Sequence, residues 1–388
     1  MDMGVLASRF TNVAVLRLTP PEFDGSLFEL YSVKEGHIDR VSRLRVPFRT
    51  HRTYQWYASR LPLLLINTSL MLLLAVRARK FLGANDRGTS GLGIGWASSL
   101  VLLLMKEFRL IDTFAYYRVD WFVGRPNQNY DYLIVNVFFR FIDQVLSQTA
   151  NFVWNITNAV RVAAKRTYHY ESRNELVVMP PVNIVPQLGN SHWTLDPYII
   201  YCGEVKHGCG LPMILDALRI LQAENKTVKL KVLGRARGDY LTSLLKDYSD
   251  LFNSGVCQYL GGFDLGDDDD RDRVNRIVAD AYAGVAIYQY GQKNTSNYVV
   301  PNRILLYLAN HTPVLVNDDS AIADLLCPAG VAVAASLEPE SIAKSVLAIW
   351  ESSEQRSWLR SNIGPFMAKF ANTAPSVEAL QELTTFAR

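Results

Sequence analysis

The stretch YVVPNRILLYLANHTPVLV, residues 298 to 316, contains the succession of patterns that decides the fold. Apolar residues spaced for one face of a helix follow Pro301 and Asn302, and a run of valine and leucine follows a turn at 310 to 312. A helix that leads through a turn into a buried strand is half of a parallel β-α-β unit. We expect Asn302 to cap this helix and Arg303 to bring a guanidinium to its N-terminus, where unpaired N–H groups attract anions.

The same alternation of strands and helices runs through the whole chain. The second half has expected strands at DPYIIYCG, VKLKVLG, AGVAIYQY and PVLVN, and expected helices at LPMILDALRILQAE, RDRVNRIVADA and PESIAKSVLAIWE. The first half has expected strands at 12–18, 90–97, 112–121 and 174–186, and expected helices at 61–81, 98–108 and 133–149. This rhythm predicts two doubly wound α/β domains with parallel sheets.

The proline-rich stretch MPPVNIVPQLGNSHWTLDP is the expected joint between the two domains. We place one domain at residues 1–185 and the other at residues 186–388. The last helix is a candidate to cross back to the first domain.

The composition is typical of a globular protein of this size. The chain has 388 residues, of which 49% are hydrophobic and 20% are charged, and two domains are expected. The cysteines form no C-x-x-C pair, which favours reduced thiols over a disulfide framework. No secretory signal peptide is predicted at the start. These features predict a cytoplasmic protein. The cysteines are Cys202, Cys209, Cys257 and Cys327.

Positive charge is concentrated in the first half of the chain. Residues 1 to 200 carry 22 Lys and Arg against 15 Asp and Glu, a balance of +7 against +3 for the whole chain. Basic residues surround LPLLLINTSLMLLLAV, residues 61 to 76, which is shorter than the roughly 20 apolar residues that cross a bilayer. Two interpretations stay open: a peripheral helix on the anionic cytoplasmic face of a membrane, or a buried helix of an α/β layer with solvated basic ends.

Several segments resemble GT-B glycosyltransferases. YCGEVKHGCGLPMILDAL, LKVLGRARGDY, GGFD with VADAYAGVAIYQY, and YVVPNRILLYLANHTPVLVND resemble, in this order, the donor-domain segments that hold a nucleotide-sugar. In the first half, TSGLGIGWASSLVLLLMKEF, AYYRVDWF, TANFVWNIT and LVVMPPVNIV are similar in order to the acceptor domain. The resemblance covers roughly residues 85 to 370. It implies the GT-B fold, an α/β arrangement of two Rossmann-like domains that face each other across a cleft.

The resemblance also implies a donor site in the second domain. Its glycine-rich loop permits close backbone approach after the strand YIIYC, while Lys206 and His207 supply donors. Arg303 would neutralise a diphosphate at a helix N-terminus. The predicted donor-binding residues are Gly203, Glu204, His207, Gly208, Tyr288, Tyr298, Asn302 and Arg303.

The sequence departs from the pattern of retaining members at four positions. Where those members carry an arginine and a lysine for the leaving phosphate, an ungapped register places Glu204 and Cys209. Their pair of glutamates falls on Tyr298 and Leu306. Lys206 and Arg235 are the substitute cations that we predict. The amino end starts near what resembles the end of the first helix, so the first strand of the acceptor domain is expected to be missing or replaced.

The predicted chemistry needs no metal and no cofactor besides the donor. Asp120, in YYRVDWF, is the candidate base, and it can alternatively cap a helix or pair with Arg118. The predicted catalytic residues are therefore Asp120, Lys206 and Arg235. The DDDD run at 267–270 is expected to start a helix rather than hold a metal. No nucleic-acid-binding motif is present, so no nucleic-acid partner is predicted.

These observations predict a glycosyltransferase that moves a sugar from a nucleotide-sugar, UDP-linked or GDP-linked, to a glycan or lipid-linked acceptor. Three alternatives stay open. One is an inverting enzyme resembling bacterial polysaccharide glucuronosyltransferases, with Asp120 as base. Another is a catalytically silent GT-B scaffold that partners an active transferase. The third is a nucleotide-sugar epimerase.

Overall fold

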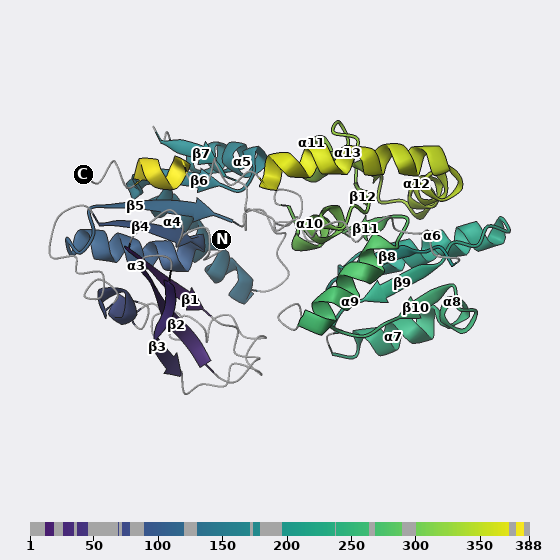
Figure 1. Ribbon diagram of the computed structural model, residues 1–388, viewed down its shortest axis with the longest axis horizontal. Helices are drawn as coiled ribbons and strands as arrows, with labels where there is room; N and C mark the ends of the chain where they lie inside the picture. The colour runs from purple at the N-terminus through teal and green to yellow at the C-terminus, as the bar shows by residue number, and fades with distance from the viewer. Residues whose placement is uncertain are drawn as a thin grey trace. The chain divides into compact units, whose positions relative to one another are not determined.

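The chain folds into two compact units, which are described separately (Figure 1). One unit consists of residues 1–123, 127–181 and 373–388, and the other of residues 124–126 and 182–372. The chain leaves the first unit at residue 181, inside the proline-rich stretch. The computed structural model describes residues 12–18, 26–34, 37–45, 69, 72–77, 89–119, 130–170, 174–178, 196–236, 238–263, 268–288, 300–371 and 378–383.

A six-stranded parallel sheet forms the centre of the second unit (Figure 1). Its order is β10-β9-β8-β11-β12-β13, so the direction of winding reverses between β8 and β11. Such a reversal leaves a crevice at the carboxyl ends of the two strands, where open α/β sheets bind ligands. The strands are β8 (Ile199–Cys202), β9 (Leu230–Leu233), β10 (Cys257–Tyr259), β11 (Gly284–Ala286), β12 (Val314–Asn317) and β13 (Ala332–Ala335).

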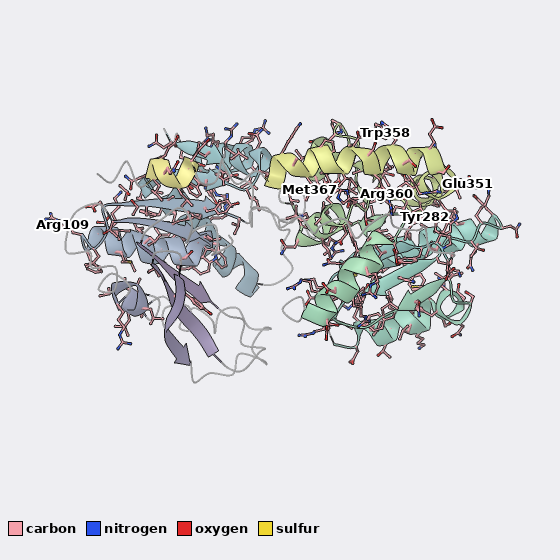
Figure 2. All side chains as sticks on the ribbon, viewed as in Figure 1. Arg109, Tyr282, Glu351, Trp358, Arg360 and Met367 are labelled. Atoms are coloured by element: carbon pink, nitrogen blue, oxygen red, sulfur yellow. The ribbon has the colours of Figure 1, made fainter. Side chains whose placement is uncertain are left out.

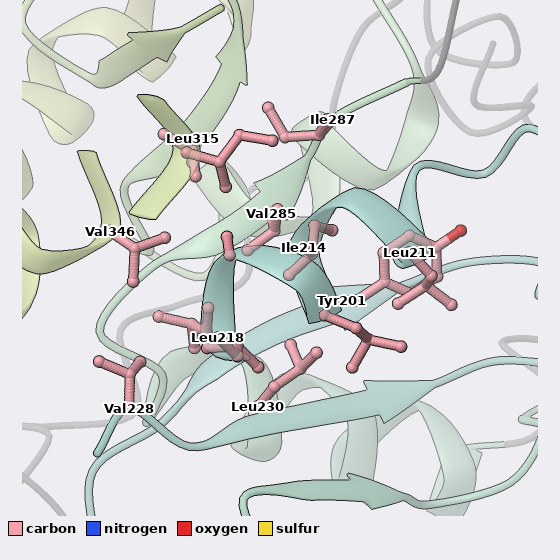
Figure 3. Packing of buried hydrophobic residues seen from close by; sticks show 14 of the residues in the cluster. Tyr201, Leu211, Ile214, Leu218, Val228, Leu230, Val285, Ile287, Leu315 and Val346 are labelled. Atoms are coloured by element: carbon pink, nitrogen blue, oxygen red, sulfur yellow. The ribbon is translucent and has the colours of Figure 1, made fainter. Parts of the chain in front are cut away.

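Helices connect these strands and bury their apolar faces. In α6 (Leu211–Ala223), leucine and isoleucine recur at helical spacing, and Figure 3 shows Leu211, Ile214 and Leu218 beside Tyr201 and Leu230 of the sheet. Full burial of each such side chain contributes about 1.5–3 kcal/mol. The other helices are α7 (Tyr240–Asp247), α8 (Ser249–Asn253), α9 (Asp268–Ala279), α10 (Asn302–Ala309), α11 (Ala321–Leu326), α12 (Pro339–Glu351) and α13 (Ser353–Ala371).

Helix α13 is tied to the unit by arginines that cap other helices. Arg360 donates through Nη2 to the carbonyls of Ala279 and Ala281 at 3.2 and 2.8 Å, just at the end of α9 (Figure 2). Arg356 donates through Nη1 to the carbonyls of Ile349 and Trp350, near the end of α12. Carbonyls that a helix leaves unpaired at its C-terminus are satisfied here by cations, which also complement the helix dipole.

A four-stranded parallel sheet in the order β4-β5-β6-β7 lies in the first unit, and the helices α3, α4 and α5 connect its strands. The segment 378–383 belongs to this unit, because the Ser90 hydroxyl donates to the Leu383 carbonyl at 3.1 Å. The chain therefore returns from the second unit after α13. The elements are β4 (Ser90–Ile94), α3 (Gly95–Glu107), β5 (Thr113–Arg118), α4 (Tyr130–Thr149), β6 (Phe152–Asn155), α5 (Asn158–Tyr168) and β7 (Glu175–Val177).

A separate antiparallel sheet precedes the parallel one. The predicted strand at residues 12–18 is β1 (Asn12–Leu18), but it pairs antiparallel with β2 (Ser26–Lys34) and not within a parallel sheet. Strand β3 (His37–Arg45) completes this sheet. Strands β2 and β3 were not predicted, and their pairing is irregular at two places, because Leu27 of β2 and Val41 of β3 have no paired residue. A bulge of this kind breaks the two-residue alternation by which a strand is found.

The first unit encloses a network of charged and hydroxyl groups. Arg118, at the end of β5, is completely buried and forms an ion pair with Asp143 of α4 at 3.0 Å. The hydroxyls of Tyr116 and Tyr168 also donate to Asp143, at 2.6 and 2.7 Å. Asp120, the partner considered for this arginine, lies outside the described residues. Arg118 donates further to Asn155, Tyr170 and Ser147.

We predict that Arg118→Met destabilises the first unit by about 3–5 kcal/mol, because Asp143, whose side chain is 15% exposed, keeps its charge without a cation. Urea unfolding followed by the fluorescence of the buried Trp154 measures this loss. Arg219→Met is the control, since Arg219 pairs with Asp250 at the surface and such pairs contribute about 0–1 kcal/mol. Equal effects of the two substitutions would contradict a stabilising role for the buried network.

Candidate functional site

The candidate site lies where the winding of the second sheet reverses. The loop after β8, residues 203–210, runs close to the loops that follow β9 and β11. A Cβ on Gly234 would lie 1.7 Å from the carbonyl oxygen of Gly203, and one on Gly210 would lie 2.2 Å from that of Ile287. Any larger residue at these two positions would collide with the neighbouring loop, so both positions require glycine. The three loops therefore lie in contact at the carboxyl ends of neighbouring strands.

The guanidinium of Arg303 lies at this junction. Its central carbon is 4.5 Å from the ring centre of Tyr201, in β8, and 4.7 Å from that of Tyr288, which follows β11. Its Nη2 would be 2.8 Å from a Cβ on Gly203, whose φ is +144°. Arg303 belongs to the first turn of α10. Its guanidinium is held between the rings of Tyr201 and Tyr288, and Gly203 leaves room for it because glycine has no side chain.

Arg303 is a partly exposed residue whose guanidinium meets no carboxylate among the described residues. Its Nη1 is buried and has no hydrogen-bond partner among those residues. Burial raises the pKa of Tyr288 and of Tyr201, although Arg303 opposes both shifts. Burial likewise raises the pKa of Cys202 to about 12 against the same opposition. These neighbours are therefore neutral at physiological pH and cannot balance the guanidinium, which stays protonated.

Two buried polar side chains hold the elements around Arg303 in place. The backbone N–H of Cys202 donates to the Tyr307 hydroxyl at 2.7 Å, and this hydroxyl donates to the Val285 carbonyl at 3.2 Å. Helix α10 is thereby fixed to β8 and β11 together. The side-chain amide of Asn317 bonds both the N–H and the carbonyl of Tyr288, at 2.9 and 3.0 Å. The position of each flanking ring is consequently set by the sheet.

The prediction that Asn302 caps α10 is wrong. Pro301 occupies the N-cap position with φ −62° and ψ 141°, and no side chain caps the helix. Asn302 is the first helical residue and its side chain is exposed. Proline holds its own φ near −62°, and the extended ψ of Pro301 keeps this residue outside the helix. Asn302 is therefore the first residue inside the helix and not its cap. The helix N-terminus consequently has no side-chain acceptor of its own.

The other predicted cations lie on the loops after β8 and β9. Lys206 forms an ion pair with Glu204, with Nζ and Oε2 2.6 Å apart. The ring of His207 packs on that of Tyr240 at 4.3 Å between centres. Arg235 is exposed, and its carbonyl accepts a hydrogen bond from Val205 at 3.0 Å, so the two loops run side by side.

Some predicted residues cannot be placed. Asp120 and Tyr298 lie outside the described residues. Gly208 is described, with φ +78°, and belongs to the loop after β8. Asp268 to Asp270 form the first turn of α9, as expected of a helix start. Within the described ranges, no group of three His, Cys, Asp or Glu side chains could hold a metal ion.

Sequence reasoning missed Tyr201, Tyr307 and Asn317. Tyr201 and Tyr307 lie within apolar runs, which predict ordinary core residues. The sequence does not indicate which groups their hydroxyls bond. Asn317 ends the run PVLVN, where a polar residue after a buried strand is a usable sign of a site.

Comparisons with known proteins show the fold. No model of a protein family matches this sequence, and no curated protein matches it. Anabaena HepE in complex with UDP aligns at a TM-score of 0.60 and 13% identity, over 82% of this chain and 81% of that one. Sucrose-phosphate synthase of Thermosynechococcus elongatus aligns at a TM-score of 0.61 and 14% identity, over 81% and 77%.

A further match is a TarM variant of S. aureus in complex with fondaparinux, α-GlcNAc-glycerol and UDP. It aligns at a TM-score of 0.55 and 12% identity, over 76% of this chain. This chain spans 55% of the length of that protein. Together with the two parallel sheets, these likenesses confirm the expected α/β architecture: the chain has the GT-B fold of nucleotide-sugar glycosyltransferases.

Proposed function

We propose that the protein is a glycosyltransferase that binds the diphosphate of a nucleotide-sugar donor against Arg303. The observation that carries this proposal is a buried guanidinium without a carboxylate among the described residues, at the point where the sheet reverses its winding. A charge removed from water is costly unless an opposite charge meets it. A phosphate group supplies that charge, and the uncapped N-terminus of α10 adds unpaired N–H donors.

The remaining donor contacts follow from the loops. Gly203 leaves room for the Arg303 guanidinium, and Gly208 lies on the same loop, while Lys206 and Arg235 provide further cations. Side chains of Glu204, His207, Tyr288, Tyr298 and Asn302 complete the proposed donor site. Three cations and a helix N-terminus can stabilise a departing diphosphate without a metal ion. UDP is the ligand of choice for testing, because structures of similar fold contain it.

We predict that Arg303→Met lowers UDP affinity at least tenfold, because it removes a charge-assisted contact of about 1.5–3 kcal/mol. The same substitution should keep or raise the free energy of unfolding without ligand, since it relieves an unbalanced buried charge. Calorimetry with UDP and a thermal melt without it measure the two effects. Arg219→Met, at the exposed pair with Asp250, is the control and should leave UDP affinity unchanged. A ligand-free Arg303→Met protein that is much less stable would indicate a structural role instead.

We further propose that the acceptor is a glycan or lipid-linked molecule at the cytoplasmic face of a membrane. In α4, Val137 and Phe141 are 59% and 60% exposed, with the exposed Arg140 between them on the same side. In the helical segment 72–77, Leu74 is completely buried and Leu73 is 55% exposed. The segment thus packs into an α/β layer, as one of the two interpretations expects, and still offers an apolar side chain to a surface.

Exposed apolar side chains beside arginines suit an anionic bilayer surface, to which each nearby cation contributes about 1 kcal/mol. The free cysteines of the described residues agree with the reducing cytoplasm. No described helix combines the length and the apolar character that crossing a bilayer requires.

Flotation with liposomes tests this part. The protein should float with vesicles that contain phosphatidylserine and float less with purely neutral ones, and Val137→Ser with Phe141→Ser should reduce recovery severalfold. Leu245→Ser, at an exposed apolar residue of α7, is the matched control. Equal recovery of wild type and double variant would remove these residues from the proposed surface.

A catalytically silent scaffold is the second candidate, and one observation favours it. Cys209 is buried, and Lys206 is paired with Glu204, so the loop after β8 offers less free positive charge than the retaining pattern. Asp120 remains the proposed base of an inverting alternative.

Slow release of glucose from UDP-glucose by the purified protein, lost in Arg303→Met, is expected of an enzyme. UDP binding without any hydrolysis would favour the scaffold.

A further inference from the structure

The ion pair of Glu204 and Lys206 is a consequence of how the loop after β8 is held. Between them, Val205 is completely buried, donates to the Arg235 carbonyl and forms a parallel bridge with Ala236. In an extended segment, the two neighbours of an inward residue project to the opposite side. Glu204 and Lys206 therefore meet on the outer side of the loop, with side chains 28% and 48% exposed.

This pair lies on the loop that also supplies Gly203, a neighbour of the Arg303 guanidinium. Gly203, immediately before Glu204, is the residue against which the Arg303 guanidinium packs. The Tyr201 hydroxyl donates to the Glu204 carbonyl at 2.9 Å, and the ring of the same tyrosine faces Arg303. Three residues of extended chain span at most about 11 Å, so the Cα of Lys206 lies within that distance of the Cα of Gly203.

The two cations of this region differ in their charge balance. Arg303 has no carboxylate partner among the described residues, whereas Lys206 already has one in Glu204. An anion that reaches Arg303 is attracted by the guanidinium and displaces no carboxylate from it. A second phosphate that approaches Lys206 has to take the place of the Glu204 carboxylate, or accept its repulsion at close range.

We propose that Glu204 competes with the terminal phosphate of the bound nucleotide for Lys206. The pair then sets how much more tightly the site holds a nucleoside diphosphate than the corresponding monophosphate. Glu204 is thus a specificity-determining residue that weakens the hold on the diphosphate, which is the leaving group and product of glycosyl transfer. This inference rests on the proposed donor site at Arg303.

Calorimetry with UDP and UMP tests the competition in four proteins: wild type, Glu204→Gln, Lys206→Met and the double variant. Glu204→Gln should bind UDP about fivefold more tightly, the gain expected from freeing a half-exposed ion pair, and should bind UMP as the wild type does. Lys206→Met should bind UDP more weakly and UMP unchanged. In the Lys206→Met background, Glu204→Gln should bring no gain.

Several results would overturn the inference. Unchanged or weaker UDP binding by Glu204→Gln would mean that the carboxylate does not compete. An equal gain for UMP, or a gain that persists without Lys206, would assign the effect to the general field of the carboxylate. Unchanged UMP binding by Glu204→Gln shows that this variant is folded. If wild type binds neither nucleotide, the donor site itself is refuted, and this outcome is distinct from the others.

Discussion

The candidate site depends on one constraint, the placement of the Arg303 guanidinium between two tyrosine rings. A buried cation with an unbonded Nη1 reduces stability, and the surrounding structure must hold it in place. Gly203 leaves room for it, and the neutral Tyr201 and Tyr288 give it polarisable faces. Such a costly feature is understandable where an anion is to be bound, because the binding energy then includes relief of the unbalanced charge.

The topology explains why this residue lies where it does. The reversal of winding between β8 and β11 opens the sheet at the carboxyl ends of these strands. Tyr307 connects both strands to α10 through its hydroxyl, so the helix that carries Arg303 cannot shift independently of them. Asn317, one strand further, fixes the peptide of Tyr288. A rigid sheet thus positions a charge that loops alone would leave variable.

Much of this could be predicted from the sequence. Buried parallel strands are nearly continuous apolar runs, which is why YIIYC and PVLVN were found, and Arg303 stands out as a cation at a helix start. The side-chain partners could not be predicted. The pairing of Lys206 with Glu204 depends on the inward turn of Val205, and the assignment of Asn302 as a cap failed because Pro301 takes that position. The antiparallel sheet was missed because the unpaired residues Leu27 and Val41 interrupt the alternation of its strands.

A crystal structure of the protein soaked with UDP would show whether Arg303 binds phosphate. We expect a phosphate oxygen within about 3 Å of Nη1 of Arg303, the ordinary length of a charge-assisted hydrogen bond. A nucleotide bound elsewhere on the chain, or a carboxylate of the protein seated on Nη1, would contradict it.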